Sequence, residues 1–170
     1  MKTKFQLMLT AVLFITSTSS LWGQSQKNAD KNTEAWRYEI VAAGVGVQGT
    51  YLVEVWSYSK NKNVALEQCK KNAVHGIIFK GFPGNDKIRT SQKPLAPNPA
   101  VEIENADFFK RFFEAGGKYM KFVNLSTNAT PEVIKVGKEY KVGIVVSVNV
   151  SELRKYLEAA GIIRSLSNGF

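Results

Sequence analysis

The sequence is short of the residues that most metal and thiol sites require. It has one cysteine, Cys69, and one histidine, His75, among 170 residues. An internal disulfide needs two cysteines, and a structural zinc site takes four cysteine or histidine ligands, so the sequence excludes both. A secreted eukaryotic domain of this size usually carries several cysteines. The scarcity therefore favours a Gram-negative envelope protein, if the chain is exported.

Long hydrophobic runs are also missing. The stretch at residues 5–15 is apolar over only eleven positions, whereas a membrane-spanning helix needs about 20. It follows Lys2 and Lys4 and precedes small polar residues, which is typical of a secretory signal peptide. We predict a signal peptide at residues 1–23, a flexible leader at residues 24–35 and no membrane span. No cysteine follows the apolar stretch closely, which argues against a lipid anchor.

Acidic residues are in the minority, with 14 Asp and Glu against 23 Lys and Arg. Loss of Lys2 and Lys4 with the signal lowers the formal net charge from +9 to +7. In an exported protein this charge favours an acidic partner, either an envelope protein or an acidic polymer, and export disfavours nucleic acid. The basic residues are dispersed along the chain, which also suits a solubilising surface.

The clearest local pattern lies in residues 51–82 and predicts a strand, a helix and a second strand. Tyr51 to Tyr58 are β-branched, aromatic and roughly alternating, as in a strand. Residues 64–75 have helical periodicity, with small side chains in one row at Ala65, Cys69 and Ala73. We expect Gly76 to end this helix and the apolar run Ile77 to Phe79 to form a short buried strand.

The remaining pattern predicts one α+β domain over residues 36–163, with a mixed or antiparallel sheet and helices packed on one face. Residues 140–150 alternate most regularly and should form the central strand. A last helix should begin at the N-cap Ser151 and end at Gly161, before a C-terminal tail at residues 164–170. Further strands are expected at residues 36–43, 118–124 and 132–136, and a further helix at residues 105–113.

Residues 81–100 contain four of the five prolines and have no periodicity, which predicts a long irregular loop. Loops of this length in compact domains are often functional. A partner-contact surface is one interpretation, with basic side chains beside apolar anchors at Phe82, Lys87, Arg89, Lys93 and Leu95. The alternative is a tolerated surface insertion.

Three patterns resemble chemical motifs without meeting their requirements. Gly44-x-Gly46-x-x-Gly49 matches a dinucleotide fingerprint in letters, but it precedes a strand and not a helix, so a hairpin turn explains it better. Cys69 and His75 lie six residues apart and point to different sides of their helix, which argues against a catalytic dyad. The acidic residues Glu102, Glu104 and Asp107 lack the spacing of a calcium loop. We expect no metal and no cofactor.

The element order, together with the Ala65-x-x-x-Cys69-x-x-x-Ala73 helix, resembles small periplasmic α+β domains of flagellar and curli-type envelope-assembly accessory proteins. The resemblance implies an exported, non-enzymatic binding or assembly module, in the periplasm or associated with the outer membrane. Two other functions stay open. One is a small periplasmic hydrolase that uses the acidic residues 102, 104 and 107, and the other is a carrier of apolar ligands lined by the helix at residues 105–113.

Overall fold

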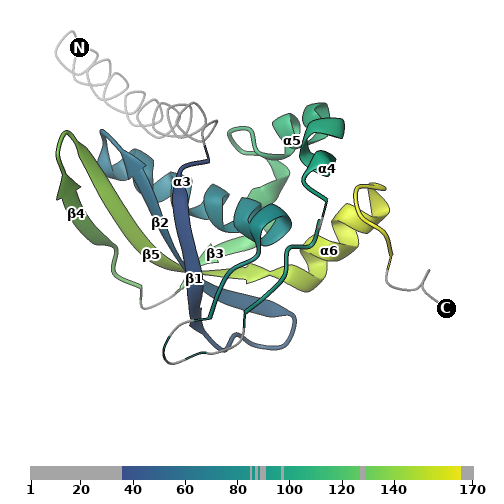
Figure 1. Ribbon diagram of the computed structural model, residues 1–170, viewed down its shortest axis with the longest axis horizontal. Coiled ribbons are helices and arrows are strands. Elements are labelled where there is room, and N and C mark those ends of the chain that lie inside the picture. Colours follow the sequence, from purple (N-terminus) through teal and green to yellow (C-terminus); the bar gives the residue numbers. More distant parts are fainter. Residues whose placement is uncertain are drawn as a thin grey trace, which may run out of the picture.

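The computed structural model describes residues 36–84, 86, 88, 91–96, 98–126 and 129–165, which form an antiparallel sheet with helices packed against it (Figure 1). The predicted α+β class is confirmed. The predicted signal peptide and leader, and most of the tail, lie outside the described residues. The strands are β1 (Tyr38–Gly44), β2 (Thr50–Ser59), β3 (Val123–Leu125), β4 (Glu132–Val136) and β5 (Glu139–Asn149). The helical segments are α3 (Lys62–His75), the π-helical η1 (Gly76–Lys80), α4 (Ala100–Glu104), α5 (Ala106–Phe112), the 3₁₀ segment η2 (Lys118–Lys121) and α6 (Val150–Ala159).

β5 organises the sheet. It pairs with β2 along one edge, while β3 and β4 share its other edge, and β1 completes the sheet beyond β2. Because β5 has neighbours on both edges, the prediction that residues 140–150 form the central strand is confirmed. Alternate side chains of β5 are buried toward the helices, at Val142, Ile144, Val146 and Val148.

Helix α3 lies across β2 and β5 with its row of small residues against the sheet. Ala65, Cys69 and Ala73 are fully buried, as the spacing predicts. The Cys69 sulfur lies 3.4 Å from the carbonyl oxygen of Val55 in β2 and 3.3 Å from that of Val142 in β5. Small side chains allow this close approach because they keep the helix axis near the sheet surface.

The chain after α3 differs from the prediction. Gly76 does not end the helix, and residues 77–79 are not a strand: the helix continues as η1 and ends at Gly81, which has φ +66°. Gly76 serves close packing instead, because a β-carbon there would lie 2.9 Å from Ile40 of β1. A three-residue apolar run fits a buried helix as well as a buried strand, and Ile77 and Ile78 are buried in η1.

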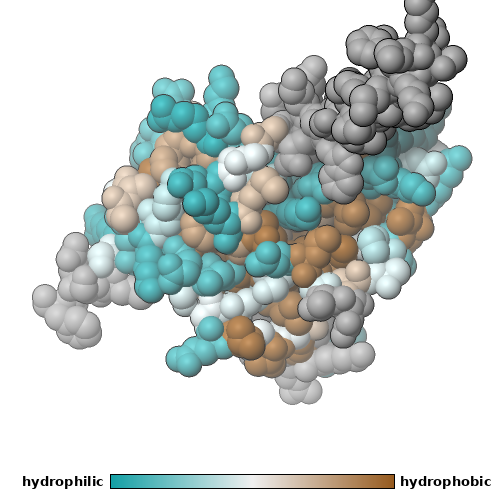
Figure 2. All heavy atoms as spheres, turned by 180° about the vertical axis from the view of Figure 1, so that it is seen from behind, coloured by the Kyte–Doolittle hydropathy of each residue, from teal (hydrophilic) through white to brown (hydrophobic). Residues whose placement is uncertain are grey.

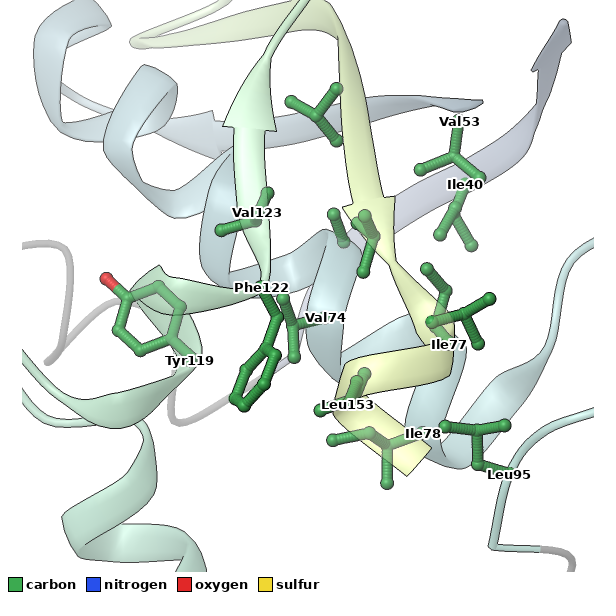
Figure 3. Packing of buried hydrophobic residues seen from close by; sticks show 14 of the residues in the cluster. Ile40, Val53, Val74, Ile77, Ile78, Leu95, Tyr119, Phe122, Val123 and Leu153 are labelled. Atoms are coloured by element: carbon green, nitrogen blue, oxygen red, sulfur yellow. The ribbon is translucent and has the colours of Figure 1, made fainter. Parts of the chain in front are cut away.

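Aromatic side chains fill the space between the sheet and the shorter helices. Phe109, Phe112 and Phe113 of the α5 region pack on one another and on Tyr119, Phe122 and Tyr156. Tyr119 and Phe122 belong to the buried core, and Figure 3 shows Phe122 beside Val74 of α3. The strand predicted at residues 118–124 is therefore only partly correct. Its first half is the helical η2, which turns Tyr119 inward, and only β3 is extended.

The N-cap of the last helix lies two residues before the predicted one, Ser151. The N-cap of α6 is Asn149, whose side-chain oxygen accepts a hydrogen bond of 3.0 Å from the Glu152 amide. Ser151 is already helical, and its amide donates to the carbonyl oxygen of Gly49 in the β1–β2 loop. Gly161, with φ +72°, follows the helix as predicted. Within the part of the chain that the structure describes, no helix has the length and apolar character to cross a membrane.

Candidate functional site

The residues predicted to contact a partner in the segment 81–100 do not share one environment. Phe82 and Leu95, predicted as apolar anchors of a partner contact, are only 7% exposed and belong to the core. Lys93 is exposed, while Lys87 and Arg89 lie outside the described residues. The two side chains therefore attach the segment to its own domain. A partner contact through the three basic residues stays a prediction.

Backbone hydrogen bonds tie this segment to the sheet and to the end of the long helix. Phe82 and Gln92 exchange two hydrogen bonds across the segment, and Pro83 accepts one from Ala42 of β1. The amides of Leu95 and Ala96 donate to the carbonyl oxygens of Ile77 and Ile78. These two carbonyl groups belong to the last helical turn, where they have no partner within the helix. Figure 3 shows Leu95 beside Ile77 and Ile78.

A buried histidine joins three elements that are far apart in the sequence. His75, at the end of α3, is 2% exposed. Its Nδ1 lies 2.7 Å from the hydroxyl of Tyr38 in β1, and its Nε2 lies 3.0 Å from Oε1 of Glu102 in α4. The Trp36 ring stacks on the imidazole with 3.4 Å between ring centroids. We call Trp36, Tyr38, His75 and Glu102 the histidine cluster.

The charges of the histidine cluster follow from burial and hydrogen bonding. Burial holds the pKa of His75 below its ordinary value, so the imidazole is neutral at pH 7. The hydrogen bond from His75 lowers the pKa of Glu102, so this carboxylate is ionised and can only accept. Nε2 therefore carries the proton and donates to Glu102, while Nδ1 accepts from the Tyr38 hydroxyl. Burial raises the pKa of Tyr38, which keeps the phenol protonated.

The histidine cluster predicts a stability that falls in mild acid. Below pH 6.5, the unfolded chain protonates its histidine, whereas the folded chain resists protonation. The unfolded state then binds more protons, so the free energy of unfolding decreases from pH 7 to pH 5, and Glu102 adds to the loss below its ordinary pKa of 4.5. Urea unfolding at pH 7, 6 and 5 measures the effect. His75 is the only histidine in the sequence, so a urea midpoint that is constant over this range would contradict the assignment.

The histidine cluster has the order of groups found in hydrolytic triads, with a hydroxyl, an imidazole and a carboxylate in a row. Neither hollow found among the described residues includes any of its members. The predicted acidic residues do not converge either, since Glu104 and Asp107 are exposed and only Glu102 reaches His75. The described residues bring no three potential metal ligands together. The hydrogen bonds of His75 connect β1, α3 and α4 to one another.

The other motifs of the sequence have structural roles. Gly44, Gly46 and Gly49 lie where β1 turns into β2, so the hairpin interpretation is confirmed. The glycines lead into a strand, and not into the helix that a dinucleotide fingerprint opens. Burial raises the pKa of the Cys69 thiol to about 12, which leaves it protonated and unreactive. Cys69 faces the sheet and His75 faces the aromatic residues, so the two do not form a dyad.

Two shallow hollows lie on the described surface. One, of about 310 Å³, is lined by residues 44–52 of the hairpin with Phe82, Ile88 and Gln92. The other, of about 540 Å³, surrounds the Gly116–Gly117 turn and carries Arg111, Lys118 and Lys121. Neither is acidic, and neither lies along the phenylalanine side chains of α5, which are packed into the core. The hollows therefore do not favour a hydrolase that uses the acidic residues. They also do not favour a carrier of apolar ligands lined by the helix at residues 105–113.

An exposed apolar surface lies at the outer edge of the sheet, at β4. All five residues of β4 are exposed, and three are large and apolar: Val133 (45%), Ile134 (41%) and Val136 (49%). Among the described residues, β4 pairs with β5 alone. Figure 2 shows apolar atoms gathered on the side of the molecule where the strands lie, with hydrophilic residues around them. Exposed apolar edge strands are templates for pairing with another chain.

A polar network borders this edge on the sheet face that α3 does not cover. Lys141, directly opposite Ile134, lies 2.9 Å from Glu39 of β1 and over the Trp56 ring. Glu139, opposite Val136, forms an ion pair with Arg37. The Trp56 ring in turn lies over Gly143, where a β-carbon would come within 2.6 Å of it. The β4 edge is thus an apolar strip beside charged groups that are already paired, as at the centre and rim of protein interfaces.

Comparison of the chain with family models, with curated proteins and with solved structures found no match. The geometry alone therefore identifies the candidate sites. Sequence reasoning predicted β4 as a strand but missed that it lies at an edge, since strand order is not a local property. It also missed the histidine cluster, because Tyr38 and Glu102 are 37 and 27 residues from His75. The only local signal for the cluster was a single histidine on the helix whose small residues Ala65, Cys69 and Ala73 were expected to pack on the sheet.

Proposed function

We propose that the protein is an exported, non-enzymatic binding or assembly module of a Gram-negative cell envelope, and that it docks through the β4 edge. The observation that carries the proposal is the outer edge of β4, which pairs with no other described strand and exposes three large apolar side chains. Natural proteins usually protect such an edge with charges, bulges or a covering element. An edge that keeps apolar residues fits a strand that is covered by a partner.

Two further features support a binding function. The flat edge has an apolar strip with a satisfied polar rim, and such patches mark interaction sites. The titratable groups of the histidine cluster are directed at one another inside the domain. The basic net charge favours an acidic surface, on an envelope protein or an acidic polymer, for any partner other than a second copy of the chain.

Paired lysine substitutions test the proposal. Val133→Lys with Val136→Lys places two charges on the β4 edge, and we expect this variant to fold and to lose its stoichiometric partner in pull-downs from envelope extracts. The matched control is Val45→Lys with Val47→Lys, which makes the same change at two exposed valines of the β1–β2 loop, 91% and 78% exposed. The control should recover the partner.

The comparison between the two variants decides the outcome. Equal recovery by both would remove the β4 edge as the docking surface. Recovery of no partner by the unmodified chain, neither a second copy nor another envelope component, would overturn the binding function itself. Thermal unfolding of each variant confirms that a loss of binding is not a loss of fold.

A further inference from the structure

The direction of the free backbone groups on β4 follows from its hairpin. Val136 and Glu139 pair across the two-residue turn Gly137–Lys138, in which Gly137 has φ +60°. Residues that flank a two-residue hairpin loop exchange backbone hydrogen bonds, and this pairing alternates along the strand. Glu132, Ile134 and Val136 therefore direct their N–H and C=O groups toward β5. Val133 and Lys135 direct theirs outward.

These outward groups are self-complementary in one antiparallel register. If Ile134 lies opposite Ile134 of a second copy, then Val133 lies opposite Lys135 of that copy, and the same pair repeats across the two-fold axis. The two pairs exchange four hydrogen bonds, and every outward N–H and C=O group of the two residues gains a partner. A shift by two residues in one direction places Lys135 against Lys135. The opposite shift brings Lys135 to Pro131, which has no N–H to donate.

The side chains agree with the same register. A two-fold axis through the Ile134 pair is perpendicular to the sheet, so the sheets of the two copies join and their uncovered faces lie on the same side. The two Ile134 side chains meet at the axis, where they are 41% exposed in one chain. Glu132 faces Val136 of the other copy. No like charges lie opposite each other, which is the arrangement that cross-strand pairs require.

We propose that β4 pairs with β4 of a second copy of this chain, antiparallel and with Ile134 opposite Ile134, so that the two sheets become one. This inference rests on the proposed function, because it names the partner that the β4 edge binds. A second copy is favoured over an unrelated strand for two reasons. Each copy supplies the outward N–H and C=O groups and the Ile134 side chain with which the other copy pairs. The charged residues of each β4, Glu132 and Lys135, also lie opposite uncharged residues of the other.

A proline at Val133 tests the backbone pairing. Val133→Pro removes an outward N–H and leaves the hydrogen bonds between β4 and β5 in place. In protein purified from cells expressing the full-length chain, we expect a dimer in sedimentation, and we expect the proline variant to associate about tenfold or more weakly. The matched control, Val133→Thr, keeps the N–H and the β-branched shape, and it should remain dimeric.

A single introduced cysteine tests the register. Residues opposite each other at a position without hydrogen bonds have Cα atoms about 4.5 Å apart, within reach of a disulfide. Ile134→Cys should therefore form a covalent dimer upon mild oxidation. Val136→Cys should not, because the two copies of this residue are four positions apart along the pair, about 13 Å. The native Cys69 does not compete, since it is buried.

The outcomes separate this inference from the proposed function. A dimer that tolerates Val133→Pro, or a covalent dimer through Val136→Cys instead of Ile134→Cys, would overturn the pairing proposed here. A monomer overturns it as well. The unmodified monomer could instead recover a different envelope partner that the variant with Val133→Lys and Val136→Lys does not recover. In that case the β4 edge is still the docking surface, and the partner bound there is another protein.

Discussion

Replacement of residues 81–100 by a Gly-Ser linker of equal length is expected to abolish the folded state or to bring it close to its unfolding midpoint at 25 °C. The change removes Phe82 and Leu95 from the core, and truncation of a large buried apolar side chain costs about 2–5 kcal/mol. Without these buried side chains, the amides of residues 95 and 96 are no longer held in position to donate hydrogen bonds to the last turn of the helix. The sum approaches the whole stability of a typical domain, about 5–15 kcal/mol.

Circular dichroism during thermal and urea unfolding measures this loss. Leu95→Ala alone should lower the free energy of unfolding by about 3 kcal/mol, while Lys93→Ala, at an exposed position of the same segment, should leave it unchanged. A linker variant that unfolds at the temperature of the unmodified chain would show that the segment only decorates the surface, which is the alternative that the sequence left open.

Replacement of His75 by alanine is expected to cost about 3–5 kcal/mol of stability. The substitution leaves a cavity beneath Trp36, whose ring lies 3.4 Å from the imidazole, and cavities add to the loss of buried contacts. It also leaves the Tyr38 hydroxyl without its acceptor in a site where that group is largely buried. An unsatisfied buried polar group costs about 1–3 kcal/mol.

Tyr38→Phe is the control for this prediction. It removes the hydroxyl, keeps the ring and leaves the buried Nδ1 of His75 without its donor, so its cost should be about 1–3 kcal/mol. The double variant should cost less than the two single losses added together, because both remove the same contact. Urea unfolding of the three variants at pH 7 gives these values. A His75→Ala variant no less stable than Tyr38→Phe would mean that the imidazole contributes only that hydrogen bond.

The sequence predicted the elements whose signals are local. Alternation identified β5, and the spacing of Ala65, Cys69 and Ala73 identified the side of α3 that packs on the sheet. The glycines between β1 and β2 indicated a hairpin because the residues after them favour a strand. In each case, a few neighbouring residues are enough for the prediction. Side chains return to the same face every 3.6 residues in a helix and every two residues in a strand, so a short stretch shows the pattern.

The errors arose where distant residues decide the local structure. Gly76 is a common helix terminator in sequence, but here β1 packs against it and the helix continues. Phe82 and Leu95 lie among prolines, so their segment was predicted as an irregular loop with apolar anchors for a partner. Both side chains are instead buried in the core, and amides of the segment donate to the carbonyl groups of Ile77 and Ile78.

By itself, the sequence determined the α+β class, the central strand, the buried row of α3 and the absence of an internal disulfide. Only the tertiary structure decided which groups meet and which remain open. It placed Tyr38 and Glu102 on the two nitrogens of His75, and it left β4 at an edge with its apolar side chains exposed. The physical reason is that periodicity orients a side chain relative to its own element, whereas strand order and helix docking depend on the free energy of burying all elements together.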